Sequence, residues 1–254
     1  MLPEKRALAL WFLLTPIVSF GESADYSEAQ LGEIWDQAIH ILGGNANVVA
    51  RWQDDINYLV VTDDEVPAVQ QRVAEVFAAI ETQVNLSIDL AGRVSVESYL
   101  QQINRLPAHR LSDCRNTDRC ANFVVVLSDL AAMQSIASTI PLRDVYRSSL
   151  ADQSAVCFFA PYQRASVILQ ALVFVKSDLP ASLVRTCLNE EIYQSFGLFS
   201  DFENSRYFSF NNSVAEKQIT PLDKHLLSTL YEFDSGTPVF AVVRRLIDRL
   251  ESRQ

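Results

Sequence analysis

The residues best suited to chemistry lie between positions 187 and 201, where Glu190, Glu191 and Gln194 fall within about one turn of a predicted helix. A separation of four residues places Glu190 and Gln194 on one helix face, with Glu191 turned from Glu190 by about 100 degrees. Their carboxylate and amide oxygens can converge on a hard cation such as calcium or magnesium, and a carboxylate can also act as a general base. These positions supply none of the imidazole ligands on which catalytic zinc sites mainly rely.

The spacing of these residues resembles the zinc-peptidase motif HExxHxxGxxH. Glu190, Gln194 and Ser200 stand in place of the three histidines. The resemblance implies that Glu191 holds a vestigial general-base position and that Gly197 turns the chain. It also implies ligand-position or cavity residues at Glu190, Gln194, Ser200 and Asp201. Because no imidazole remains to hold an ion that would lower the pKa of a bound water, we predict no zinc and no cofactor.

Other interpretations of these polar residues remain open. They could hold an oxygen-ligated cation, or they could form a metallopeptidase site with non-histidine ligands. The interpretation that we favour is a structural network in place of the ion. In that network Gln194 would bond with Ser209 or Asn211, and Arg185 or Arg206 would neutralise a carboxylate.

A second resemblance follows downstream. Ser209, Phe210 and Asn211 resemble the Ser-x-Met-Asn turn of metzincins, with Phe210 in the methionine position, and residues 220–231 resemble the helix that follows it. Residues 187–231 are also similar to the family catalogued as domain of unknown function 2927, which shows Cys-Leu-x-Glu-Glu-x-x-Gln-x-x-Gly-Leu and then Ser-x-Phe-Asn. The resemblance implies a bacterial envelope protein with no established activity. It further implies an α+β, metzincin-like fold, with a twisted mixed sheet, packed helices, an active-site-type helix and a helical C-terminal part.

The N-terminus has the features of a secretory signal. Lys5 and Arg6 precede an apolar run over residues 7–18, and Ser19 and Gly21 have the small side chains that signal peptidase accepts. We predict a signal peptide over residues 1–21 and a periplasmic or secreted mature chain, with cleavage after Ala24 as the second choice. An uncleaved anchor is the alternative, although the run is shorter than the ~20 residues that span a bilayer. No later segment is long and apolar enough to span.

Composition indicates a folded, acidic protein. Hydrophobic residues make up 49% of the 254 positions and glycine only seven, so residues 22–254 can bury the core of a single domain. The formal net charge is −10. Because an acidic surface repels phosphate backbones, nucleic acid is excluded as a partner.

Four cysteines in a chain with export features predict disulfides. Three pairings are possible. We favour Cys114 with Cys120, which closes a short polar loop, and Cys157 with Cys187, which ties a strand to the start of the 187–201 segment. A zinc thiolate cluster has no CxxC pair to support it, and free thiols are the remaining alternative.

Hydrophobic periodicity predicts the elements that position these residues. An N-terminal packing helix is expected over 27–42, an amphipathic helix over 66–84 and a closing helix over 239–250. Strands are expected at 57–61, 94–99, 122–127, 155–159 and 167–175. The 122–127 run is continuously apolar, which is typical of a strand buried on both faces.

Three functions fit these observations. The first is a catalytically inactive metzincin-like protein that uses its former substrate cleft or a sheet edge to bind a peptide or envelope protein. The second is an active peptidase with unusual ligands, and the third is a structural subunit of an envelope assembly.

Overall fold

The computed structural model describes residues 26–43, 47–63, 67–105, 121–151, 156–211 and 218–252. Within them six strands form one sheet: β1 (Arg51–Trp52), β2 (Ile56–Val61), β3 (Ile88–Val94), β4 (Phe123–Ser128), β5 (Cys157–Arg164) and β6 (Val167–Lys176). The order is β1-β6-β4-β2-β3, with parallel pairing throughout. β5 pairs with β6 in the antiparallel sense. The fold is therefore α+β, as the sequence predicts.

Helices cover both faces of this sheet because its central strands are apolar on both sides. In β4, Phe123, Val125 and Leu127 point into one core, while Val124 and Val126 point into the other. The first core is covered by α2 (Pro67–Glu81) and α6 (Ala181–Gln194). The second is covered by α3 (Val96–Arg105), α4 (Leu130–Thr139) and α5 (Asp144–Ala151). The expectation of a doubly buried strand over 122–127 is confirmed.

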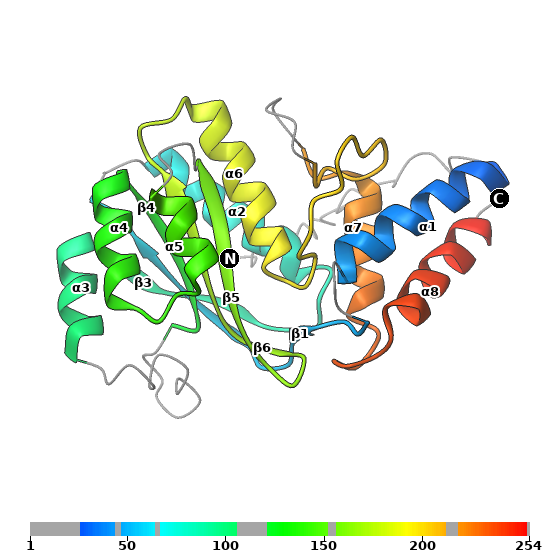
Figure 1. Cartoon of the computed structure of the whole chain (residues 1–254), viewed down its shortest axis with the longest axis horizontal. Helices are drawn as coiled ribbons and strands as arrows, with labels where there is room; N and C mark the ends of the chain where they lie inside the picture. Colours follow the sequence, from blue (N-terminus) through cyan, green and yellow to red (C-terminus); the bar gives the residue numbers. More distant parts are fainter. Residues whose placement is uncertain are drawn as a thin grey trace, which may run out of the picture.

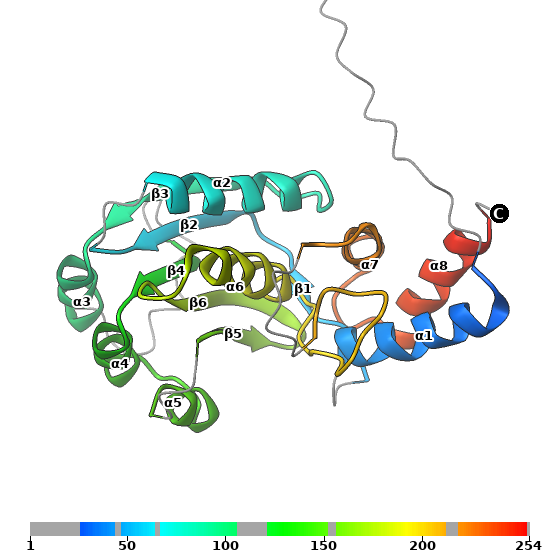
Figure 2. The same cartoon turned by 90° about the horizontal axis from the view of Figure 1, so that it is seen from above.

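The remaining helices gather at the end of the molecule where β1 lies, away from α3 and α4 (Figures 1 and 2). These are α1 (Glu28–Gly43), α7 (Pro221–Leu230) and α8 (Val239–Glu251). Trp52 joins this end to α6, because its indole Nε1 donates to the Ser195 carbonyl oxygen at 2.9 Å. The helices expected over 27–42, 66–84 and 239–250 are confirmed as α1, α2 and α8. No helix in the described ranges has the length and apolar character to cross a membrane.

One strand prediction is wrong. Residues 94–99 do not form a strand: β3 ends at Val94 and α3 begins at Val96. The Ser95 hydroxyl accepts from the Ser98 backbone N–H at 3.1 Å, which starts the helix. Val96, Tyr99 and Ile103 are then buried at helical spacing, so the short polar alternation at 94–99 was misleading. Helices α4 and α5 were not foreseen, and the predicted signal peptide and the Cys114–Cys120 pair lie outside the described residues.

Candidate functional site

Helix α6 carries the motif recognised in the sequence and is anchored on three sides. Leu188 and Ile192 are fully buried against the sheet. Cys187 forms a disulfide with Cys157 of β5, with their Cα atoms 5.9 Å apart, so this predicted pairing is confirmed. The third side faces α2.

The motif residues lie mostly inside the protein. The side chains of Glu191 and Gln194 are buried, and Glu190 is half-buried. The Gln194 amide donates to Asp201 Oδ1 at 2.6 Å, so its partner is in the loop after the helix, whereas the sequence suggested Ser209 or Asn211. Ser195 Oγ donates to the Glu191 carbonyl oxygen at 2.7 Å and closes the last turn. The structure thus brings Gln194 and Asp201 together.

Gly197 turns the chain at the end of the motif. Its φ of +111° is one that residues with a side chain rarely adopt. A Cβ at this position would collide with the Ala50 carbonyl oxygen and lie 2.8 Å from Leu230 Cδ2. The glycine therefore allows the α6 terminus to approach the backbone beside β1 and helix α7.

The turn at residues 209–211 is held by α7. Asp223, which is fully buried, accepts from the Ser209 backbone N–H at 3.1 and 3.2 Å and from the Thr220 backbone N–H at 2.6 Å. Thr220 Oγ1 accepts in return from the Asp223 N–H, which completes a capping box. Burial raises the pKa of Asp223, and the hydrogen bonds from Thr220 and Ser209 oppose this rise. Phe210 is fully buried, and its carbonyl accepts from Phe202 N at 2.9 Å.

No cluster of three or more His, Cys, Asp or Glu side chains within the described ranges is arranged to hold a metal ion. Ser200, the residue in the third histidine position, is half-buried and its N–H donates to the Ile41 carbonyl oxygen at 3.3 Å. That Glu190, Glu191, Gln194, Ser200, Asp201 and Phe210 share one cavity stays a prediction.

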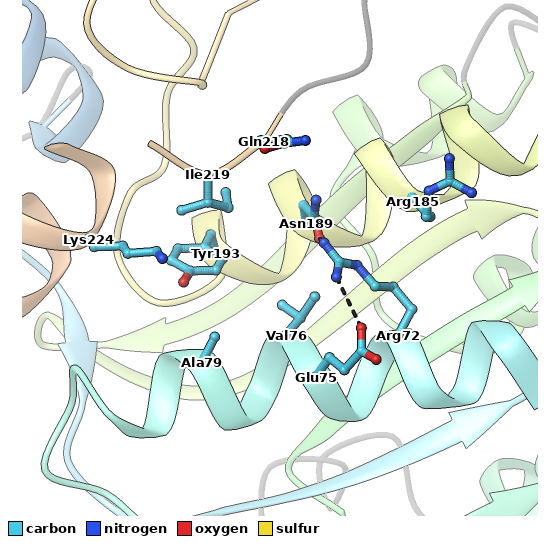
Figure 3. Close-up of a pocket in the computed structure, with 10 residues that line it drawn as sticks. All are labelled: Arg72, Glu75, Val76, Ala79, Arg185, Asn189, Tyr193, Gln218, Ile219 and Lys224. Carbon is cyan, nitrogen blue, oxygen red and sulfur yellow. Dashed lines mark hydrogen bonds and ion pairs between the residues drawn. The ribbon is translucent and has the colours of Figure 1, made fainter. Parts of the chain in front are cut away.

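A cleft of about 490 Å³ opens on the α2 side of the motif helix (Figure 3). Helix α6 lines it with Arg185, Asn189 and Tyr193, which are spaced four residues apart and so share one face. The lining includes none of Glu190, Glu191 and Gln194. The opposite wall is α2, and residues 218–219 and α7 close the far side.

Positive charge dominates the cleft although the chain is acidic. Arg72, Arg185 and Lys224 line it, against the single carboxylate of Glu75. Arg72 donates to Asn189 Oδ1 at 2.8 Å and pairs with Glu75 at 3.1 Å. Its Nε is buried and makes no hydrogen bond within the described structure. These contacts hold the guanidinium across the gap between α2 and α6.

Tyr193 contributes a neutral hydroxyl at the other end of the cleft. Its oxygen accepts from Gln83 Nε2 at 3.0 Å. Burial raises the pKa of Tyr193 above its ordinary value of 10, so the phenol is uncharged near neutral pH. In Figure 3 the Lys224 side chain extends from α7 toward the Tyr193 ring.

An apolar cavity of about 190 Å³ adjoins this cleft. Arg72 and Arg185 line both spaces. The remaining lining includes Val69, Leu179 and Val184, together with Leu127 near the end of β4 and Ser177 directly after β6. The cavity thus lies at the carboxyl ends of parallel strands, where open α/β sheets commonly bind ligands.

The sequence-based reasoning missed this cleft. Arg185 was expected only to neutralise a carboxylate of the motif, and the helix over 66–84 was expected to contribute core residues, with no role predicted for Arg72 and Glu75. One signal was available, because Arg185, Asn189 and Tyr193 form a polar stripe at helical spacing. The hydrogen-bond partners of Asn189 and Tyr193 lie far earlier in the chain, Arg72 by 117 residues and Gln83 by 110.

The family model described as "Protein of unknown function (DUF2927)" matches residues 23–237, which extends the similarity well beyond the 187–231 segment. None of the curated proteins matches the chain.

Proposed function

The chain belongs to the family of unknown function DUF2927, and we propose that it is an exported, catalytically inactive protein that binds a ligand in the cleft between α2 and α6. The frame of this protein is metzincin-like. Its supporting feature is the order of elements, in which the sheet is followed by the motif helix α6, the turn at 209–211 and helix α7. Export rests on the signal-like N-terminal sequence.

The observation that carries this proposal is that different residues of α6 line the cleft and form the motif. One face, with Arg185, Asn189 and Tyr193, opens into a cleft whose volume is in the range of ligand sites. The motif residues point elsewhere, and Gln194 is already engaged by Asp201. The polar groups of the cleft also have internal partners, since Asn189 accepts from Arg72 and Tyr193 accepts from Gln83, but they border a space that a ligand can enter.

The donor chemistry of the motif also supports a role without catalysis. Hydrolysis by a zinc peptidase requires a metal that lowers the pKa of a bound water toward ~7. Glu190, Gln194 and Ser200 offer oxygen atoms where that motif offers imidazoles, and oxygen donors favour harder ions than zinc. Glu191 alone would be a carboxylate without an activated nucleophile.

The test uses the oxidised mature protein, purified from periplasmic extract. We expect an N-terminus at Glu22, substoichiometric zinc by elemental analysis and no cleavage of casein or of a mixed peptide library. Glu191→Gln should leave the melting temperature and ligand binding nearly unchanged. The matched control is Glu190→Gln on the same helix. Stoichiometric zinc together with proteolysis that Glu191→Gln abolishes, and Glu190→Gln does not, would establish the peptidase instead. A retained Met1 together with four alkylatable thiols would contradict an exported, oxidised mature protein.

A further inference from the structure

Building on the proposed function, in which the cleft holds a ligand without transforming it, we propose that the cleft recognises a carboxylate attached to an apolar group. The C-terminus of a peptide that ends in an apolar residue presents this chemistry. The carboxylate lies among Arg72, Arg185 and Lys224, and the last side chain enters the adjoining apolar cavity.

The charge of the cleft selects an anion. Three cationic side chains face one carboxylate there, although the whole chain has a formal net charge of −10. A local excess of positive charge on an acidic protein attracts anions to this place and repels them elsewhere. Lys224 makes no ion pair with another described residue, so its charge is uncompensated by them.

The position of Arg72 favours a planar anion such as a carboxylate. Its guanidinium is held between Glu75 of α2 and Asn189 of α6, so it does not have to be ordered when a ligand arrives. A guanidinium matches a carboxylate through parallel N–H donors, and such charge-assisted bonds are stronger than neutral ones. Arg72 already pairs with the Glu75 carboxylate through a single contact from one terminal nitrogen, at 3.1 Å, which shows that its guanidinium is within reach of an anion in the cleft.

The adjoining cavity selects an apolar group beside the anion. Because Arg72 and Arg185 line both spaces, a carboxylate bound to either residue has the apolar cavity next to it. Val69, Leu179 and Val184 supply apolar surface, and burial of apolar area there favours binding. A small inorganic anion would leave this cavity unused.

The neutral groups of the cleft favour a peptide over a fatty acid, which offers the same carboxylate and apolar chain. The amide side chains of Asn189 and Gln218 line the cleft, and Figure 3 shows Gln218 across it from α2. Amide side chains can donate to and accept from the backbone of a peptide. A fatty acid has no such groups to match them.

Isothermal titration of the mature, disulfide-containing protein tests this assignment with four probes. They are an acetylated tripeptide of two alanines and a C-terminal leucine, its C-terminal amide, the same tripeptide ending in glycine, and decanoate. We expect the leucine acid to bind most tightly, and the amide to bind about tenfold or more weakly, the scale of one charge-assisted hydrogen bond. The glycine acid should also bind more weakly, because it leaves the apolar cavity empty.

Variants locate the binding. Lys224→Gln and Arg185→Gln should each lower the affinity for the tripeptide acid that ends in leucine. Neither should change the already weak affinity for the corresponding amide by much. Ala68 is exposed and lines the apolar cavity, so Ala68→Leu should fill part of that cavity. The variant should therefore lower the affinity for the acid ending in leucine more than the affinity for the acid ending in glycine. Arg244→Gln, at an exposed position on α8, removes an equal charge far from the cleft and should have no effect.

Each contrary result has its own meaning. Equal affinity for acid and amide, no binding of any probe, or an equal effect of Arg244→Gln would overturn the carboxylate site. Tighter binding of decanoate than of the leucine acid would overturn the peptide as its source. Hydrolysis of a bound peptide would refute the proposed lack of catalysis and leave the carboxylate site in place. Failure of the site and failure of the proposed function are therefore distinguishable.

Discussion

Removing the Cys157–Cys187 disulfide should destabilise the protein by a predictable amount. The bond closes a loop of 30 residues that contains the β5–β6 hairpin and the first half of α6. On the chain-entropy model, a loop of this length contributes about 3.6 kcal/mol at 25 °C by restricting the unfolded chain. For a chain of this size, the loss corresponds to a drop in melting temperature of about 7–14 °C. We choose Cys157→Ala with Cys187→Ala, because alanine places no hydroxyl in the buried position of Cys187.

The assay is equilibrium unfolding in urea, with and without reductant, for the wild type and the double variant. Without reductant, the difference between the two proteins contains the cross-link and the lost sulfur packing. With reductant, only the packing difference between the two proteins remains. Any change that reductant causes in the unfolding free energy of the double variant comes from another cysteine pair. The contribution of the cross-link is the loss of unfolding free energy that reductant causes in the wild type, minus the loss that it causes in the double variant. Equal responses of both proteins would refute the reasoning, because the bond would then contribute nothing to stability.

Four further predictions concern the packing of the motif region and the ionisation of Asp223 and Tyr162. Gly197→Ala should reduce the free energy of unfolding by about 3–5 kcal/mol, since a Cβ forces a strained φ and meets the Ala50 carbonyl; a loss below 1 kcal/mol in urea unfolding would contradict this. Asp223→Ala should cost about 2–4 kcal/mol through two orphaned backbone N–H groups, and Asp223→Asn should cost clearly less. Because burial raises the pKa of Asp223 in the folded state, its stabilising contribution is complete below the ordinary pKa of 3.8 and is lost as pH rises through the folded value; Asp223→Asn should remove this pH dependence from the unfolding free energy. Burial raises the pKa of Tyr162 from 10 to about 12, so the unfolded state loses its proton first and stability falls between pH 10 and about 12; a pH series of unfolding midpoints should show a smaller fall for Tyr162→Phe, and identical curves would exclude this cause.

Much of the fold was predictable because its information is local. The apolar run at 123–127 has no polar face, which is typical of an interior strand, and it lies within β4. The periodicity of α2 and α8 likewise matches the burial of Val73, Phe77, Val243 and Leu246. Local pattern failed where it was short: Val94 to Tyr99 alternates over six residues, yet the hydroxyl of Ser95 and the burial of Ile103 select a helix.

Part of the site was also predictable, and the reason was again local. The resemblance implied that Gly197 turns the chain, and its φ of +111° is a backbone conformation that favours glycine. The partner of Gln194 was not predicted, because the amide can reach several polar groups and the path of the loop after α6 selects Asp201. The spacing of the motif thus identified Gln194 as a hydrogen-bonding residue, but the path of the loop after α6 determines that Asp201 is its acceptor.

The sequence by itself determined the helices and strands with long, regular hydrophobic patterns, because such periodicity acts between near neighbours. It also indicated the α+β class through a family resemblance, and it favoured, among three possible pairings, the disulfide that ties the motif helix to β5. Only the tertiary structure decided where the cleft between α2 and α6 lies and which side chains line it. The cleft exists because α2 and α6 pack side by side on one face of the sheet, which brings Arg72 to Asn189 across 117 residues of chain. Its charge depends on which side chains of separate helices face the same space, and no local pattern encodes that pairing.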